Sequence, residues 1–289
     1  MAEITIRAVE AHDHRSLKAC EELQRIIWGS EPIQIIPDHI LITAVANGGL
    51  LLMAYHDEEP IGFAFSFLGL QEGRPKHCSL MAGVVAEARY RGVGYRLKLA
   101  QREHVLRQGL ELITWTFDPL QSANARFNLH KLGALPVRYL REFYGEMRDE
   151  LNRGLPTDRF FVEWWLRSRR VVSKLEKSYR TPTLAELLAR GVPVINRTAE
   201  REGWRYNVEL LPDLEAPRLL LEIPMSTPEM KRARPELARQ WRMETRLLLE
   251  KYFERGYLVT EFLIQDDRGY YLLEQATKEE VLERDGLQA

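Results

Sequence analysis

The sequence predicts an α/β protein with a central twisted, mixed sheet flanked by helices, followed by an α+β extension. Short apolar runs and amphipathic segments follow one another in the order strand–helix–strand–strand–strand–helix–strand–helix. One long amphipathic helix and a hairpin pattern come later in the chain. With 289 residues, 45% of them hydrophobic, the chain can bury a full core and is long for one domain and short for three.

The overall composition narrows the function classes. The 41 basic and 42 acidic side chains give a net charge of -1, which argues against a nucleic-acid binder that relies on bulk positive charge. No run approaches 18 apolar residues, and the N-terminus lacks a basic-then-apolar signal pattern. We therefore expect a cytoplasmic protein without a membrane partner, in which Cys20 and Cys78 are reduced thiols.

The first helix and strands are predicted from the spacing of their apolar residues. Ile4–Arg7 alternates like an opening strand, and the apolar residues of His14–Trp28 recur at a helical spacing. The segment Gly29–Pro37 contains two prolines, so a long helix cannot continue through it. Gly49–His56 and Pro60–Leu68 then predict two strands joined by a charged turn.

A second set of elements surrounds a glycine-spaced turn. We interpret Gly69–His77 as a polar loop leading to a central strand, Leu80–Val85. The helix that follows ends at Gly109, and Leu112–Phe117 predicts a further strand. The next segment is predicted to be a short helix closed by Gly133.

The turn after the central strand is a candidate phosphate site. Arg89, Gly92 and Gly94 form an R-x-x-G-x-G pattern, in which side-chain-free residues leave backbone N–H groups exposed at a helix N-terminus. A purely steric strand-to-helix turn gives the same pattern. A dinucleotide fingerprint would need a small residue where Leu97 stands, and a P-loop motif is absent.

These motifs resemble the GNAT superfamily of acyl-CoA N-acyltransferases over roughly residues 3 to 167. The resemblance rests on Arg89-Tyr90-Arg91-Gly92-Val93-Gly94 and on Asn124-Ala125 through Lys131-Leu132-Gly133-Ala134. It implies acetyl-CoA or succinyl-CoA as acyl donor, held by the pyrophosphate at the loop and by pantetheine at the central strand. The implied cofactor-binding residues are Val84, Val85, Arg89, Tyr90, Arg91, Gly92, Val93, Gly94, Tyr95 and Asn124.

A finer resemblance extends beyond Gly133. Arg138–Met147 and Asp158–Leu166 predict two closing antiparallel strands. With the turn between them, they look like a subgroup of predicted GNAT proteins, some of which are associated with N-succinylation of amino acids. In the superfamily the early helix–loop region shapes the acceptor pocket, so Trp28 is either an acceptor contact or a packed core residue.

The catalytic groups are the least determined part of the prediction. Many superfamily members place a tyrosine four residues before the closing glycine to protonate the leaving thiolate, but Leu129 occupies that position. Tyr139 and Tyr144 are substitute acids or buried structural tyrosines. Asn128 either orients a reacting group or packs in its helix. His77, just before the central strand, is either a base or, more simply, a solvated loop histidine.

A succinyl group or an amino-acid acceptor would bring a carboxylate, for which arginine is the usual bidentate partner. Asp158-Arg159, near a strand start, is the first pair to consider, although surface solvation is the simpler account of each arginine. The candidates by residue type are Arg74, Arg126, Arg138, Arg141, Arg159 and Arg242.

The remaining residues predict an extension without recognisable chemistry. We expect a GNAT-like domain over 1–167, a charged linker over 168–182, and an α+β extension over 183–289. The elements of the extension are predicted from the spacing of apolar residues and from capping and turn residues. They are the helices Thr183–Arg190 and Pro235–Arg255, the strand Leu219–Ile223, and the hairpin of Tyr257–Gln265 and Tyr270–Gln275.

The leading hypothesis is acyl transfer from acyl-CoA to a small-molecule amine, an amino acid or a related metabolite, by direct attack in a ternary complex. The alternative is a non-catalytic CoA-binding module, with the extension as a partner or homodimer surface. A third reading, transfer to a protein N-terminus or lysine, is weaker because the extension offers no recognisable peptide groove.

Overall fold

The structure is a computed structural model that describes residues 4–29, 34–88, 92–147 and 154–287. The chain divides into two compact units. The first contains residues 1–115 and 148–151, and the second contains 116–147 and 152–289. The division falls inside a strand, and the expected bounds of 1–167, 168–182 and 183–289 stay a prediction.

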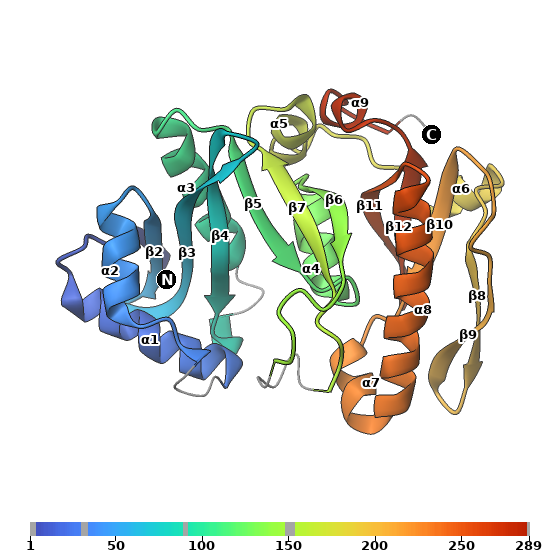
Figure 1. Cartoon of the computed structure of the whole chain (residues 1–289), viewed down its shortest axis with the longest axis horizontal. Helices are drawn as coiled ribbons and strands as arrows, with labels where there is room; N and C mark the ends of the chain where they lie inside the picture. Colours follow the sequence, from blue (N-terminus) through green and yellow to red (C-terminus); the bar gives the residue numbers. More distant parts are fainter. Residues whose placement is uncertain (1–3, 30–33, 89–91, 148–153, 288–289) are drawn as a thin grey trace. The chain divides into compact units, whose positions relative to one another are not determined.

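A mixed sheet is the centre of the first unit, as predicted (Figure 1). Neighbouring strands are antiparallel except the last pair, which is parallel. In spatial order the strands are β1 (Ile4–Ala8), β2 (Leu50–His56), β3 (Glu59–Gln71), β4 (Arg74–Val84) and β5 (Leu112–Phe117).

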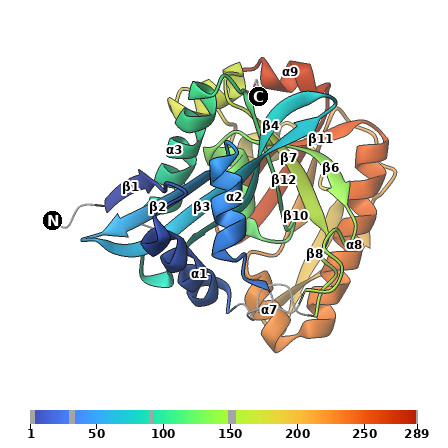
Figure 2. The ribbon, with the colours of Figure 1, turned by 60° about the vertical axis from the view of Figure 1, so that its left-hand side comes forward.

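Helices cover both faces of this sheet (Figure 2). Helices α1 (His14–Trp28) and α2 (Asp38–Ala46) pack on one face, over a core that includes Phe63. Helix α3 (Val93–Arg107) packs on the other face, where Leu97 meets the small and aliphatic residues of β2 and β3. The predicted bounds of α1 are confirmed, whereas α2 was not predicted because its residues lack a polar face.

The expected polar loop Gly69–His77 is wrong. Strand β3 continues to Gln71 and β4 begins at Arg74, so only Glu72 and Gly73, both at positive φ, form the turn. A β-bulge at Leu80 interrupts the pairing, because Phe65 pairs with Met81 whereas the adjacent Ser66 pairs with Ser79. The bulge shifts the alternation of β4, which concealed the strand's true length.

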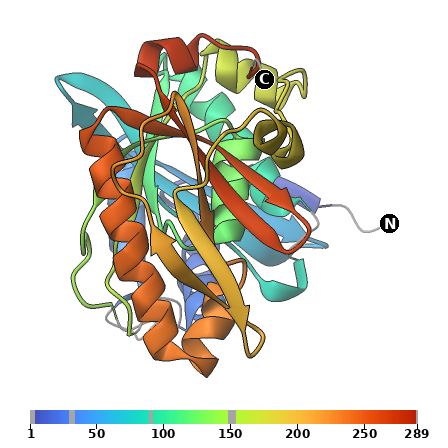
Figure 3. The same ribbon diagram turned by 90° about the vertical axis from the view of Figure 1, so that its right-hand side faces the viewer.

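The second unit contains three groups of strands and one long helix (Figure 3). The end of β5 lies next to β7 (Arg159–Trp165), which pairs with β6 (Leu135–Leu140). A three-stranded sheet has the order β10 (Arg218–Ile223), β12 (Arg268–Gln275), β11 (Tyr257–Gln265). The third group is the hairpin of β8 (Asn196–Arg201) and β9 (Trp204–Leu210).

The helices of this unit include α8 (Pro235–Glu254), whose Trp241 indole N–H donates to the Arg205 carbonyl 2.9 Å away on β9. The others are short. They are α4 (Ser122–Ala125), the π-helical turn η3 (Arg126–Lys131), α5 (Arg169–Leu175), α6 (Leu184–Ala189), α7 (Thr227–Ala233) and α9 (Lys278–Leu282). No helix in the described ranges is both long and apolar enough to cross a membrane.

The predicted helix 235–255 and the hairpin after it are confirmed, but two segments differ from expectation. The predicted strand 138–147 ends at Leu140, where a turn begins. The segment expected to be a linker contains α5, whose buried Arg170 donates from Nε to the Gly133 carbonyl 3.0 Å away. Its many charges suggested solvent exposure because the sequence does not reveal their buried partners.

Candidate functional site

The N-terminus of α3 is open to a ligand. Gly92, at φ +77°, is its N-cap, and no side chain caps the helix. The first helical bond runs from the Arg96 N–H to the Gly92 carbonyl at 3.0 Å, so the N–H groups of Val93, Gly94 and Tyr95 have no partner within the helix. The predicted loop residues Arg89, Tyr90 and Arg91 lie outside the described residues.

Space above this helix end is provided by two glycines. A Cβ atom built on Gly92 would have no described atom within 4 Å, and one on Gly94 would meet only Val84 Cγ2 at 3.9 Å. The Val93 side chain is instead buried in the α3 core, so only its backbone can face a ligand. A helix N-terminus with uncapped N–H groups favours a phosphate or another anion.

The backbone groups of Val85, just after β4, bond within the protein. Val85 donates its N–H to the Ile61 carbonyl at 2.9 Å, and its own carbonyl accepts from the Ala88 N–H at 3.1 Å. Val85 as a cofactor contact stays a prediction. Because Val85 bonds to Ile61, the peptide groups of Ala82 and Val84 point away from β3.

Strands β4 and β5 separate at a defined point. Their parallel pairing joins His77 to Ile113 and Cys78 to Thr114, and no further pair forms between these two fully described strands. Ser79 and Trp115 are thus the first residues beyond the paired region, and we call the place between these two residues the fork. Beyond the fork, the side of β4 that faces away from β3 is an edge to which an extended ligand can bond.

A buried lysine occupies the fork. Lys98 on α3 is 3% exposed, and its amine donates to Ser79 Oγ at 3.1 Å and to Gln101 Oε1 at 2.8 Å. The amine also lies 3.9 Å from the centre of the Trp115 ring. Burial lowers the pKa of Lys98 to about 7. Sequence reasoning missed this residue, although the apolar stripes on both sides of it indicated a helix covered on more than one side.

A second buried polar group lies between α3 and β4. His77 is buried on β4, so the expectation of a solvated loop histidine is wrong. Its Nε2 lies 2.6 Å from Gln108 Oε1, and Gln108 Nε2 donates to the Gly48 carbonyl. This amide orientation makes His77 Nε2 the donor, so Nδ1 accepts from Ser66 Oγ at 3.0 Å. Burial lowers the pKa of His77 below its usual value.

The predicted residues of the second unit lie around the π-helical turn. Asn124 is exposed on α4, whereas Asn128 is 5% exposed and Leu129 is fully buried. The Leu132 N–H bonds to the Phe127 carbonyl at 3.1 Å, which closes the wider turn. The backbone carbonyl of Asn128 accepts from Ala134 at 2.9 Å, so this asparagine already has a structural role.

The hydroxyl of Tyr139 is held by a buried ion pair. It donates to Asp158 Oδ2 at 2.5 Å, and Arg246 donates to the same carboxylate from Nε and Nη2 at 2.8 and 2.7 Å. Burial, followed by the Asp158 charge, raises the pKa of Tyr139 well above its usual value. Burial acts against ionisation of Asp158, but the bonds from Arg246 and Tyr139 keep its pKa low. This arrangement favours the structural role for Tyr139.

Tyr144 remains accessible. It lies in the turn after β6 and not on a strand, and it is 43% exposed. Its hydroxyl is 2.9 Å from Thr116 Oγ1 at the end of β5. The guanidinium carbon of Arg159 lies 5.4 Å from the centre of its ring.

The arginines expected to bind a carboxylate have other partners or are exposed. Asp158 pairs with Arg246 and not with Arg159, which donates to the Asp158 backbone carbonyl at 3.0 Å. Arg242 is 1% exposed and bonds to Asp118 at 2.6 Å, while its Nε and Nη1 have no partner among the described residues. Arg141 pairs with Glu250, Arg138 covers the Phe161 ring, and Arg74 and Arg126 are exposed.

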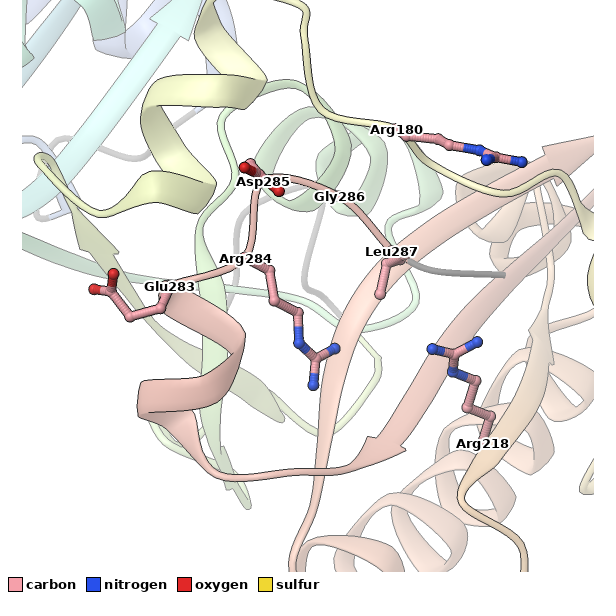
Figure 4. A pocket seen from close by; sticks show the side chains of 7 residues that line it. All are labelled: Arg180, Arg218, Glu283, Arg284, Asp285, Gly286 and Leu287. Atoms are coloured by element: carbon pink, nitrogen blue, oxygen red, sulfur yellow. The ribbon is translucent and has the colours of Figure 1, made fainter.

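Two further features lie apart from these residues. Trp28 makes an edge contact with Phe63 at 5.7 Å between ring centres, which accounts for it as a core residue. A hollow of about 560 Å³ in the second unit is lined by Arg180, Arg218 and residues 283–287 (Figure 4). Arg218 and Arg284 share the one carboxylate of Glu274 there, which offsets one of their two positive charges. Within the described ranges no cluster of His, Cys, Asp or Glu could hold a metal ion.

Solved structures with some similarity are acetyltransferases by their descriptions. One is diaminobutyrate acetyltransferase from Paenibacillus lautus, bound to L-2,4-diaminobutyric acid and coenzyme A, with 18% identity over 57% of this chain and 97% of that chain and a TM-score of 0.45. Another is the ribosomal-protein-S18-alanine N-acetyltransferase from Escherichia coli, with 13% identity over 56% of this chain and 92% of that chain and a TM-score of 0.44.

An aminoglycoside acetyltransferase from an uncultured soil metagenomic sample matches at 16% identity over 43% of this chain and 84% of that chain, with a TM-score of 0.39. No protein-family model matches the chain, and no curated protein is similar to it. TM-scores below 0.5 at such low identity do not establish a common fold, so the function has to be inferred from this chain's own residues.

Proposed function

We propose that this protein transfers an acyl group from acyl-CoA to the amine of a small molecule by direct attack in a ternary complex. The observation that carries the proposal is the N-terminus of α3, where, among the described residues, Gly92 and Gly94 leave open space above N–H groups that have no partner within the helix. An anion as large as a pyrophosphate needs such space and such donors.

The edge of β4 supplies the second part of a CoA site. Pantetheine is an extended chain with two amides, and the peptide groups of Ala82 and Val84 point away from β3 along the strand that leads to the helix N-terminus. A pantetheine arm bonded to this edge would extend from the pyrophosphate toward the fork. The thioester carbonyl would then lie near a backbone N–H of β4, which can stabilise the oxyanion.

The finer assignments belong to the same proposal. Acetyl and succinyl groups are both proposed as the transferred group, and an amino acid or related metabolite as the acceptor. A succinyl carboxylate calls for an arginine partner, and the six arginines named above by residue type stay the candidates.

Titration of the whole chain with CoA, acetyl-CoA and succinyl-CoA tests the proposal. At about 100 times the dissociation constant, a specific ligand adds roughly 2.7 kcal/mol to the free energy of unfolding. A panel of amines with each acyl-CoA, followed by free-thiol detection, then tests transfer. Absence of binding by all three compounds would overturn the proposal and reduce the glycine pattern to a steric turn.

A non-catalytic CoA-binding module is the second candidate function. Its support is that Leu129 stands where many members of the resembling superfamily have a tyrosine, and that the Tyr139 hydroxyl is held by Asp158. This candidate predicts CoA binding without thiol release from any amine, and a change of oligomeric state on CoA binding if the extension is a homodimer surface. Turnover that is lost with Gly92→Asp would exclude it.

A further inference from the structure

The fork contains an ionisable group that the residue pattern did not assign. Lys98 extends from α3 to the point where β4 and β5 cease to pair, and its amine contacts one residue from each strand, Ser79 and Trp115. A lysine with 3% exposure at the end of a paired region is costly to bury. Its position therefore calls for a function.

The amine contacts two uncharged polar side chains and one aromatic ring. Ser79 Oγ and Gln101 Oε1 both accept from Lys98, while the face of the Trp115 ring favours the ammonium form. Gln101 is fully buried, and its Nε2 has no partner among the described residues. This orphaned donor, next to the lysine, is a second indication that the fork is arranged to receive a polar ligand group.

We infer that Lys98 is the acid that protonates the departing thiolate in the proposed acyl transfer. The inference rests on the proposed function, because it places the CoA sulfur at the fork. A pantetheine arm that runs along the edge of β4 from the N-terminus of α3 reaches Ser79 after passing Val84 and Ala82. Lys98 lies one turn into the same helix, so both ends of the arm would contact α3.

In the proposed reaction Lys98 both gives a proton and takes one back. The acceptor nitrogen attacks the thioester carbon, a C–N bond forms, and the C–S bond breaks with its electron pair on sulfur. The Lys98 ammonium gives its proton to that sulfur. The resulting neutral amine then takes the proton that the new amide nitrogen loses, so the products are the amide and the CoA thiol, and Lys98 returns to its starting form.

The pKa of Lys98 supports its role as the acid. Burial lowers the pKa of Lys98 to about 7, so both its acid and its base form are available near neutral pH. The other titratable or charged groups on the adjoining elements are Tyr95, Arg96, Arg102, Glu103, His104 and Arg107 on α3, and Arg74, Lys76, His77 and Cys78 on β4. Burial lowers the pKa of both histidines.

Variants of the full chain test the assignment. Lys98→Met should keep acetyl-CoA affinity within about threefold and lower kcat by at least about 100-fold, the usual contribution of a general acid. The loss of kcat above the Lys98 pKa in the wild type should disappear in the variant. Lys98→Arg, which keeps the charge but does not titrate, should remain slow. Full activity in Lys98→Arg would overturn the proton transfer.

Lys76→Met is the matched control. Lys76 is also buried on β4 and bonds to Thr114 Oγ1 at 2.9 Å, but it lies on the paired side of the fork. The control should keep kcat and its pH profile. An equal loss of kcat in both variants would overturn the assignment, because any buried amine would then have the same effect.

A binding measurement separates this inference from the proposed function. CoA and desulfo-CoA differ only at the sulfur, so the Lys98 amine, which is mostly neutral at pH 8.5, should favour CoA by accepting a hydrogen bond from its thiol. In the wild type, the ratio of the two affinities at pH 8.5 should exceed that in Lys98→Met by about tenfold. Binding of neither compound would defeat the proposed function. Binding of both with the same ratio in the two proteins would defeat only the role of Lys98.

Discussion

Gly92 and Gly109 stand at opposite ends of helix α3 with the same left-handed conformation, at φ +77° each. A Cβ atom on either glycine would have no described atom within 4 Å. The two positions therefore impose the same backbone cost on a side chain, on the order of 1 kcal/mol, but only Gly92 adjoins the open N–H groups. Comparing the same substitution at the two glycines therefore separates the effect of backbone strain from the effect on anion binding.

Gly92→Asp should abolish CoA binding, with at least a 30-fold rise in the dissociation constant. A carboxylate at the N-terminus of α3 would occupy the anion site and repel the pyrophosphate. Gly109→Asp should retain wild-type affinity while losing more stability, because a carboxylate is unfavourable at the C-terminus of a helix. Calorimetric titration of both variants measures the difference, and equal affinities would mean that the helix N-terminus does not bind CoA.

Lys98→Met should change how stability depends on pH. Burial lowers the pKa of Lys98 from 10.5 to about 7, so the unfolded chain holds this proton between those values while the folded chain releases it. The contribution of Lys98 to stability is therefore complete above pH 10.5 and falls by on the order of 4 kcal/mol as the pH drops to 7. Urea unfolding at pH 7 and at 9.5 should show this slope in the wild type and its loss in the variant.

Asp158→Asn should destabilise the protein by about 3–5 kcal/mol, because it leaves the Arg246 charge buried beside a neutral partner. Tyr139→Phe should cost about 1–2 kcal/mol, since it removes one hydrogen bond and keeps the ion pair. Urea unfolding at pH 7 measures both. A Tyr139→Phe protein with unchanged stability and no turnover would instead make this tyrosine a reacting group.

His77→Gln should reduce the sensitivity of stability to mild acid. Because burial lowers the pKa of His77, its stabilising contribution is complete above pH 6.5 and is lost as the pH falls through the folded-state pKa. Thermal unfolding at pH 7.5 and 5.5 should therefore differ less in the variant than in the wild type. An unchanged difference would mean that groups other than His77 control the loss of stability in mild acid.

The elements that the sequence predicted well have strong local signals. The period of His14–Trp28 and the N-terminal and C-terminal residues of α8 define their helices without tertiary information. Helix α2 was missed because the nearly uniform apolar run after Pro37 has no period. The hairpin of β8 and β9 was missed because most of its side chains are only partly buried and alternate weakly.

The candidate site was predictable only where it depends on backbone. The open helix end at Gly92 follows from the spacing of two glycines. The Lys98 environment requires three elements to meet, and nothing local to Lys98 indicates that Trp115 covers it. The same holds for Tyr139, whose partners Asp158 and Arg246 are distant in sequence.

The extra residue at Leu80 gives strand β4 two different phases. Before it, odd-numbered residues such as His77 and Ser79 face α3, and after it even-numbered residues such as Val84 do so. A regular strand of the same sequence would turn Val84 to the opposite face, whereas the bulge absorbs the extra residue. The bulge thus keeps Ser79 and Val84, the two ends of the proposed donor site, on one face of the sheet.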